Sequence, residues 1–153
     1  MRLEKLVRAL SLRELTPGIV RSDEVTGGYV SDMVSDVLAY SPAGGVLVTA
    51  QPHLSMVSVA GLAGLQGVIF AYGRMPEQAV IDRAMDGELC LYSSSADTFE
   101  IAGRLYEMGL RGKTDCDTRS RRGASGPPAG RKIPSSAARR IHAEEPHLDL
   151  ESA

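Results

Sequence analysis

Three short apolar runs recur at a fixed spacing along the chain. They cover residues 46–50, 67–71 and 88–92, and each begins 21 residues after the one before. Helical stretches lie between and after them, at residues 54–66, 77–85 and 97–108. Short buried strands that alternate with helices are typical of βαβ units, whose crossovers place helices in layers on a sheet. We therefore predict a three-layer α/β fold with a mostly parallel sheet.

The first 45 residues predict less regular structure. Leu3, Leu6, Val7 and Leu10 are spaced for one face of a short helix, and residues 12–15 suit a short strand. Extended chain around residues 19–25 then meets a break at Thr26, Gly27 and Gly28. A second amphipathic helix is expected to follow directly, with Ser31 or Asp32 as its cap.

The helix that starts at Leu54 is apolar almost all round. Such a helix is buried on more than one side. We therefore expect a homodimer, formed through this helix and the Gly27–Gly28 region, because small residues permit close approach.

Composition excludes some classes of protein. The net charge of −2 argues against bulk attraction to nucleic acid or anionic lipid. No apolar run reaches the roughly 18 residues of a membrane span. The first residues lack the apolar core of a signal peptide, so a cytoplasmic protein is expected. Cys90 lies in an apolar run and suits a small buried hydrophobe.

The composition changes near Gly112. Residues 1–112 hold nine Lys or Arg and thirteen Asp or Glu, together with nearly all of the apolar periodicity. Residues 113–153 are rich in Arg, Ser, Pro and Gly, with seven basic residues and no acid between Arg119 and Arg140. We predict an α/β domain at residues 1–112 and a disordered tail at 113–153.

Candidate chemistry follows the three apolar runs. Carboxyl ends of parallel strands meet at one edge of a sheet, where ligands of open α/β folds bind. This edge would combine one imidazole, one guanidinium, several hydroxyls and the free N–H groups of three helix starts, which suits an anion such as phosphate. The candidate ligand-binding residues here are Gln51, His53, Tyr72, Gly73, Arg74, Ser93, Ser94, Asp97 and Thr98.

Several of these residues also have an ordinary structural explanation, as does the break at residues 26–28; His53, for example, suits a polar residue at a helix start. Thr26, Gly27 and Gly28 suit a tight turn, and the serines suit a capped loop. Arg74 would form a solvated pair with Glu77. Residues 1–112 lack a P-loop, a GxGxxG turn between strand and helix, a GxSxG elbow and an HExxH pair. We therefore assign no catalytic residue, no metal site and no cofactor.

Several sequence blocks resemble the DRTGG domain family. They are residues 24–32, 46–53, 67–70 and 97–106, and the likeness extends over roughly residues 2–110. Thr26, Gly27 and Gly28 match the signature, whereas Glu24 and Val25 replace its first two residues. The resemblance implies a fold similar to the N-terminal domain of HPr kinase/phosphorylase. It adds Thr26, Gly27 and Gly28 to the candidate ligand-binding residues.

The resemblance also implies a role. DRTGG domains regulate or assemble proteins whose catalytic residues lie elsewhere, so we predict a non-enzymatic module. It would sense an adenine nucleotide or phosphorylated metabolite and modulate a partner enzyme. The alternative is a structural or adaptor dimer without a small ligand, associated with a hydrogenase or another redox system. Nucleic-acid binding through residues 119–140 is a third hypothesis, which the acidic remainder of the chain disfavours.

Overall fold

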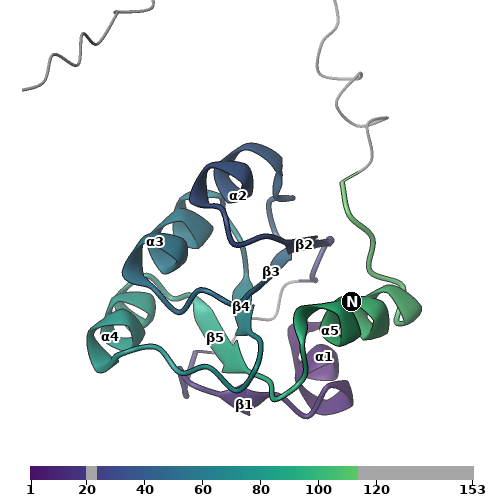
Figure 1. Ribbon diagram of the computed structural model, residues 1–153, viewed down its shortest axis with the longest axis horizontal. Helices are drawn as coiled ribbons and strands as arrows, with labels where there is room; N and C mark the ends of the chain where they lie inside the picture. The colour runs from purple at the N-terminus through teal and green to yellow at the C-terminus, as the bar shows by residue number, and fades with distance from the viewer. Residues whose placement is uncertain (20–23, 114–153) are drawn as a thin grey trace, which may run out of the picture. The chain divides into compact units, whose positions relative to one another are not determined.

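The computed structural model describes residues 1–19 and 24–113. Within these ranges the chain forms one sheet with the strand order β1-β5-β4-β3-β2. The four strands β2 to β5 are parallel, and β1 pairs antiparallel with β5 at the edge. The strands are β1 (Arg13–Glu14), β2 (Gly28–Val30), β3 (Val46–Thr49), β4 (Gly67–Phe70) and β5 (Cys90–Ser93). The predicted α/β architecture with a mostly parallel sheet is confirmed (Figure 1).

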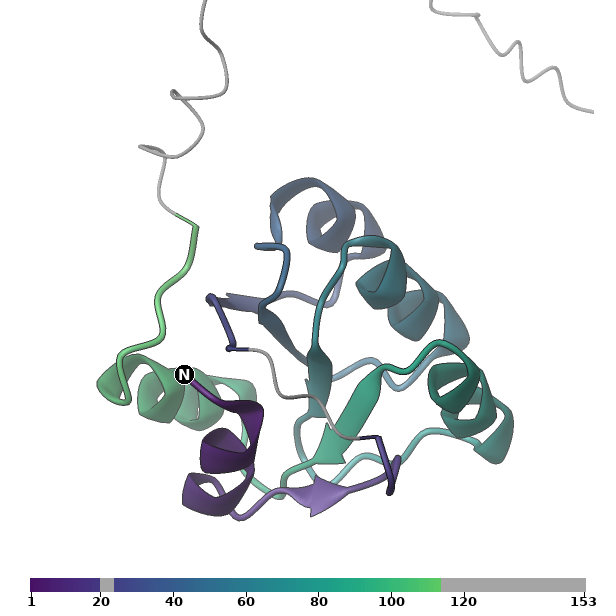
Figure 2. The same ribbon diagram turned by 180° about the vertical axis from the view of Figure 1, so that it is seen from behind.

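Five helices cover the two faces of this sheet in the part of the chain that the structure describes. Because strand order advances in one direction from β2 to β5, right-handed crossovers put the three connecting helices on one face. These are α2 (Val34–Tyr40), α3 (Leu54–Leu62) and α4 (Gln78–Asp86). The other face carries α1 (Leu3–Ala9) and α5 (Thr98–Glu107), so the fold has three layers in both views (Figures 1 and 2).

The core is divided by the sheet because successive strand residues point to opposite faces. Val46 and Val48 pack with Ile101 and Leu105 on the side of α1 and α5. Leu47 packs on the opposite side, with buried residues of α2, α3 and α4. Cys90 is buried in the first of these cores, as predicted.

The ends of two elements differ from the sequence prediction. The helix from Leu54 ends at Leu62, because Gly64 turns the backbone with a φ of 69°. The third apolar strand begins at Cys90 and includes Ser93, because Glu88 has a φ of 52° that a strand does not tolerate. The other two apolar runs form β3 and β4 where predicted.

The start of α2 corrects a second expectation. Its N-cap is Met33, which makes no side-chain cap hydrogen bond. Ser31 Oγ accepts a hydrogen bond from the Met33 N–H, and the Asp32 carboxylate bonds residues of β3 instead. The prediction that Ser31 or Asp32 caps this helix is therefore wrong.

The break at Thr26, Gly27 and Gly28 also lies in a different context. Gly28 is the first residue of β2, so extended chain follows the glycines before any helix begins. The expectation that a helix follows the break directly is wrong. The glycines therefore serve the start of a strand.

The predicted boundary near residue 112 remains a prediction, since residues 114–153 lie outside the described ranges. The basic residues between Arg119 and Arg140 lie there too. Among the residues that the structure describes, no helix is long and apolar enough to cross a bilayer.

Candidate functional site

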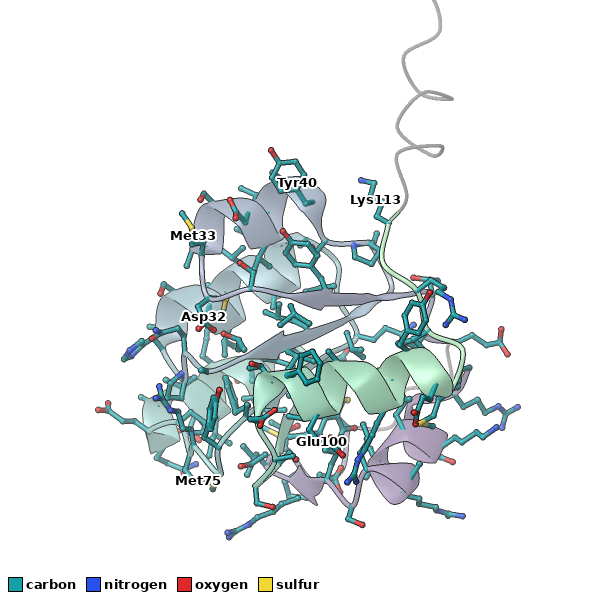
Figure 3. The ribbon with its side chains drawn as sticks, turned by 45° about the vertical axis from the view of Figure 1, so that its right-hand side comes forward. Asp32, Met33, Tyr40, Met75, Glu100 and Lys113 are labelled. Carbon is teal, nitrogen blue, oxygen red and sulfur yellow. The ribbon has the colours of Figure 1, made fainter. Side chains whose placement is uncertain are left out.

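The carboxyl ends of the four parallel strands carry the polar loops of the candidate site. Asp32 follows β2, Gln51 follows β3, Arg74 follows β4, and Ser94 follows β5. The last residues of three strands are paired with one another: Thr49 of β3 pairs with Phe70 of β4, and Phe70 pairs with Ser93 of β5. These strands therefore end at the same level of the sheet. Figure 3 shows Asp32 and Met75 on the same side of the domain, and Lys113 on the opposite side. The predicted set thus falls on one edge, except for its three glycine-motif residues.

A topological switch point lies between β4 and β5 at this edge. The chain leaves β4 toward α4 on one face and leaves β5 toward α5 on the other (Figure 1). Two backbone hydrogen bonds join the outgoing loops, from Tyr72 N–H to the Ala96 carbonyl at 2.9 Å and from Gly73 N–H to the Ser94 carbonyl at 2.7 Å. Such switch points are the usual ligand sites of open α/β sheets.

The loop after β4 holds its shape through an uncommon backbone. Tyr72 and Gly73 both have positive φ, at 61° and 65°. For a bulky side chain such as that of Tyr72 this conformation is strained by about 1–3 kcal/mol, and strain of this kind clusters at functional sites. The Tyr72 ring is 54% exposed, so an aromatic surface is presented at the rim of the sheet.

Arg74 brings the positive charge of this edge. Its Nη1 donates a hydrogen bond of 2.6 Å to the Ala50 carbonyl, and its Cζ lies 5.8 Å from the centre of the Tyr72 ring. The Ser93 hydroxyl donates to the Arg74 carbonyl at 3.0 Å, which fixes the backbone. Arg74 forms no ion pair within the described residues, so the expected pair with Glu77 is not formed. Its remaining N–H donors are available to an anion.

Asp32 is the residue that sequence reasoning missed. Its Oδ1 accepts hydrogen bonds of 2.8 Å from the Thr49 hydroxyl and from the Ala50 N–H. Thr49 is fully buried, and its Oγ1 also accepts from the Gln51 N–H at 3.1 Å. The signal in the sequence is Thr49 itself, a hydroxyl residue at the end of an apolar strand, which needs a polar partner.

The loop after β3 leads into α3. His53 is the N-cap of α3 and makes no side-chain cap hydrogen bond, so the first N–H groups of this helix are not capped by a side chain. The imidazole is exposed and Gln51 is half-buried. Both residues therefore lie at the predicted edge.

The loop after β5 uses much of its polarity internally. The Asp97 Oδ1 accepts from Glu100 N–H at 2.8 Å and caps α5. The Ser94 hydroxyl accepts from Ala96 N–H at 3.3 Å, and Thr98 begins the helix. One of the three expected free helix starts is therefore occupied by a carboxylate of the chain itself. With Asp32 and Asp97 beside Arg74, this edge has no excess of positive charge.

Thr26, Gly27 and Gly28 lie at the opposite, amino edge of the sheet. Thr26 Oγ1 donates to the Ala43 carbonyl at 2.8 Å. A Cβ on Gly27 would lie 2.8 Å from the Arg111 carbonyl oxygen. Gly27 therefore allows the backbone at Arg111 to pack closely against it, and this space is not left for a ligand. The structure separates these three residues from the rest of the predicted set.

Among the described residues, no three His, Cys, Asp or Glu side chains are grouped so that they could hold an ion. Tyr92 is a buried tyrosine of β5, and it packs in the core on the side of α1. Its burial is the largest cause that raises its pKa well above the ordinary value, and the neighbouring Cys90 is the next. Tyr92 therefore stays neutral and serves the core.

Comparison with known proteins supports the fold. Neither the family models nor the curated proteins gave a match to this sequence. Solved structures similar to this chain include the CBS and DRTGG domains of the regulatory region of Clostridium perfringens pyrophosphatase, complexed with the activator diadenosine tetraphosphate. The TM-score is 0.53 at 12% identity, and the match covers 67% of this chain and 45% of that chain. At this identity the likeness concerns the fold, and the α/β architecture is consistent with a DRTGG-like domain.

Proposed function

We propose that this chain is a non-catalytic regulatory module that binds an adenine nucleotide or another phosphorylated metabolite at the carboxyl edge of its sheet. The observation that carries this proposal is Arg74, a guanidinium without an ion pair in the described residues, held at the switch point beside the exposed ring of Tyr72. Similarity of the fold to the regulatory region of a pyrophosphatase supports the regulatory part of the proposal.

The chemistry of the edge favours a nucleotide over a bare anion. A phosphate group is a partner for Arg74, and a base is a stacking partner for Tyr72. Sugar hydroxyls are donors for a carboxylate oxygen such as Oδ2 of Asp32, in the way that acidic residues hold ribose in other α/β folds. Inorganic phosphate provides only the first of these partners, and the carboxylates of Asp32 and Asp97 would repel it. A nucleoside monophosphate or diphosphate fits this balance of charge.

The test is a calorimetric titration of the full chain with AMP, ADP, ATP, adenosine and inorganic phosphate. Loss of a charge-assisted hydrogen bond is worth about 1.5–3 kcal/mol, so Arg74→Ala should weaken nucleotide binding by about tenfold to a hundredfold. Arg83→Ala is the matched control, because Arg83 is an exposed arginine of α4 away from this edge. Circular dichroism of each variant checks that the fold is kept.

Three results would contradict the proposal. The first is an absence of heat with every nucleotide at millimolar concentration. The second is equal binding by the wild type and Arg74→Ala. The third is binding of inorganic phosphate as tight as that of the nucleotides, which would show that neither base nor sugar is recognised. A silent titration would favour the adaptor role, and capture of a redox enzyme by the immobilised full chain would then test that role.

A further inference from the structure

The outward face of α5 is apolar where a surface helix is ordinarily polar. Phe99 is 87% exposed and Tyr106 is 59% exposed, and Gly103 lies between them on the same face. The spacing i, i+4, i+7 puts these residues opposite Ile101 and Leu105, which are buried against the sheet. Phe99, Gly103 and Tyr106 are called the α5 stripe below. Exposed apolar groups arranged in this way mark interaction surfaces.

The open edge of the sheet lies beside the α5 stripe. Gly27 and Ser31 direct their backbone groups toward β3, since the Gly27 carbonyl accepts from Val46 N–H and Ser31 N–H donates to the Val48 carbonyl. Backbone groups alternate along a strand, so those of Val30 point outward, and the described residues give them no partner. The Val30 side chain is 47% exposed. β2 itself contains none of the charged or proline residues that usually protect an edge strand, and of its outward backbone groups the Gly28 N–H donates to the Arg111 carbonyl at 3.0 Å.

A groove joins the two features. Its volume is about 150 Å³, and its lining includes Val30 and Val48 from the sheet and Ala102, Leu105 and Tyr106 from α5. Arg111 also lines it, with its Cζ 3.8 Å from the centre of the Tyr106 ring, so one face of that ring is already covered. Figure 3 views this side of the domain, with α5 running alongside β2 and β3. The α5 stripe and the β2 edge therefore form one continuous surface.

We propose that a second copy of this chain covers this surface, with the two α5 helices packed antiparallel about a two-fold axis. The pattern of sizes along the α5 stripe is self-complementary. An axis that passes midway between Ala102 and Gly103 places Phe99 of one copy against the partner's Tyr106. It also places small residues at the point of closest approach. Isologous interfaces of this kind are the commonest in soluble oligomers.

The charges beside the α5 stripe follow the same symmetry. Glu100 and Arg104 lie on one flank of the helix and form an ion pair with Nε 2.7 Å from Oε1. In the antiparallel arrangement the flanks of the two helices adjoin, and Glu100 of one copy faces the partner's Arg104. Each copy then supplies one carboxylate and one guanidinium to its neighbour. A second copy therefore satisfies both members of the pair, because it presents the same two charges in reversed order.

This surface differs from the one that the sequence suggested. The buried residues of α3 (Met56, Val57 and Ala60) pack within the core that α2 and α4 share. Gly27 is buried against Pro42 and Arg111. The buried residues of α3, together with Gly27, thus serve the inside of one chain. The large exposed apolar residues of α3 are Leu54, at 49%, and Leu62, at 78%, and they lie at opposite ends of the helix.

Sedimentation equilibrium of the full chain and two matched variants tests the proposal. Phe99→Glu should weaken self-association by about a hundredfold, because each dimer loses two aromatic anchors. Leu62→Glu places the same charge on a comparably exposed residue of α3 and should leave the dimer intact. A wild type that is monomeric at a hundred micromolar or so overturns the proposal. Loss of the dimer in Leu62→Glu together with its retention in Phe99→Glu also overturns it, by placing the interface on α3.

A cross-link tests the antiparallel geometry directly. Gly103→Cys, in a Cys116→Ser background, should form a disulfide-linked dimer in air, because a cysteine Cβ at Gly103 meets no atom of its own chain within 4 Å. Gly61→Cys is the control on α3, where a Cβ is equally unhindered. Formation of the cross-link by Gly103→Cys alone supports the proposal. Cross-linking by Gly61→Cys alone, or by neither variant, overturns it.

Discussion

Replacement of Gly27 by alanine tests whether the two neighbouring glycines are there for packing. A Cβ on Gly27 would lie 2.8 Å from the Arg111 carbonyl oxygen and 3.1 Å from Cγ of Pro42. The first contact is with backbone, which cannot rotate away as a flexible side chain would. The same carbonyl accepts a hydrogen bond of 3.0 Å from Gly28 N–H. The substitution must therefore displace residues near Arg111 and weaken this bond.

The expected loss of stability follows from three contributions. Overpacking of a well-packed site costs about 1–3 kcal/mol, and a weakened backbone hydrogen bond adds about 1 kcal/mol. The reduced entropy of the unfolded chain returns about 0.4–1 kcal/mol. Gly27→Ala should therefore lower the free energy of unfolding by about 2 kcal/mol. Urea denaturation followed by far-ultraviolet circular dichroism measures the change.

Gly28→Ala is the matched control for this experiment. A Cβ on Gly28 would lie 3.7 Å from Cδ2 of Leu110, which is an ordinary contact. Its free energy of unfolding should therefore stay within about 0.5 kcal/mol of the wild type. Two equally stable variants, or a Gly27→Ala variant as stable as the wild type, would refute the packing explanation. Room for a ligand at the glycines would then be the better explanation of Gly27.

Two further predictions concern the polar edge and the core. Asp32→Ala should lower the free energy of unfolding by about 1–2 kcal/mol, and a double-mutant cycle with Thr49→Val should give a coupling of about 1 kcal/mol; a coupling near zero would show that the hydrogen bond contributes nothing. The raised pKa of Tyr92 predicts a loss of stability in alkali. Below pH 10 or so its contribution is complete, and above this the unfolded chain ionises first, so stability falls by at most about 1.4 kcal/mol per pH unit. Urea titrations at neutral and strongly alkaline pH should show a smaller loss for Tyr92→Phe than for the wild type, and equal losses would contradict the assignment.

The sequence predicted the repeating part of the fold because its signal is local. The three apolar runs form β3, β4 and β5, and each helix after them begins within one residue of its expected start. The cap that Asp97 forms is equally local, since it joins residues three positions apart. Elements that depend on residues close in the sequence can be predicted from a single sequence.

Structural features that depend on residues far apart in the sequence could not be predicted. β2 has only three residues, with Gly28 at its start, and it is a strand because β3 pairs with it. Asp32 looked like a helix cap, but Thr49 and Ala50 compete for its carboxylate from seventeen and eighteen positions away. The glycine motif suggested a binding loop because the partner of its close approach, Arg111, is far along the chain.

The two edges of the sheet are closed by different means, and this difference argues for where a ligand would bind. At the amino edge, the space beside Gly27 is filled by the backbone at Arg111 and by Pro42, and a ligand there would have to displace the chain itself. At the carboxyl edge, hydrogen bonds join the loops while the Arg74 guanidinium and the Tyr72 ring keep free surface. Gly27 belongs to the part of the sequence that resembles a family signature, and it thus has no room beside it for a ligand. We therefore place the proposed ligand site at the carboxyl edge, where Tyr72 has a positive φ of 61° and its ring is exposed.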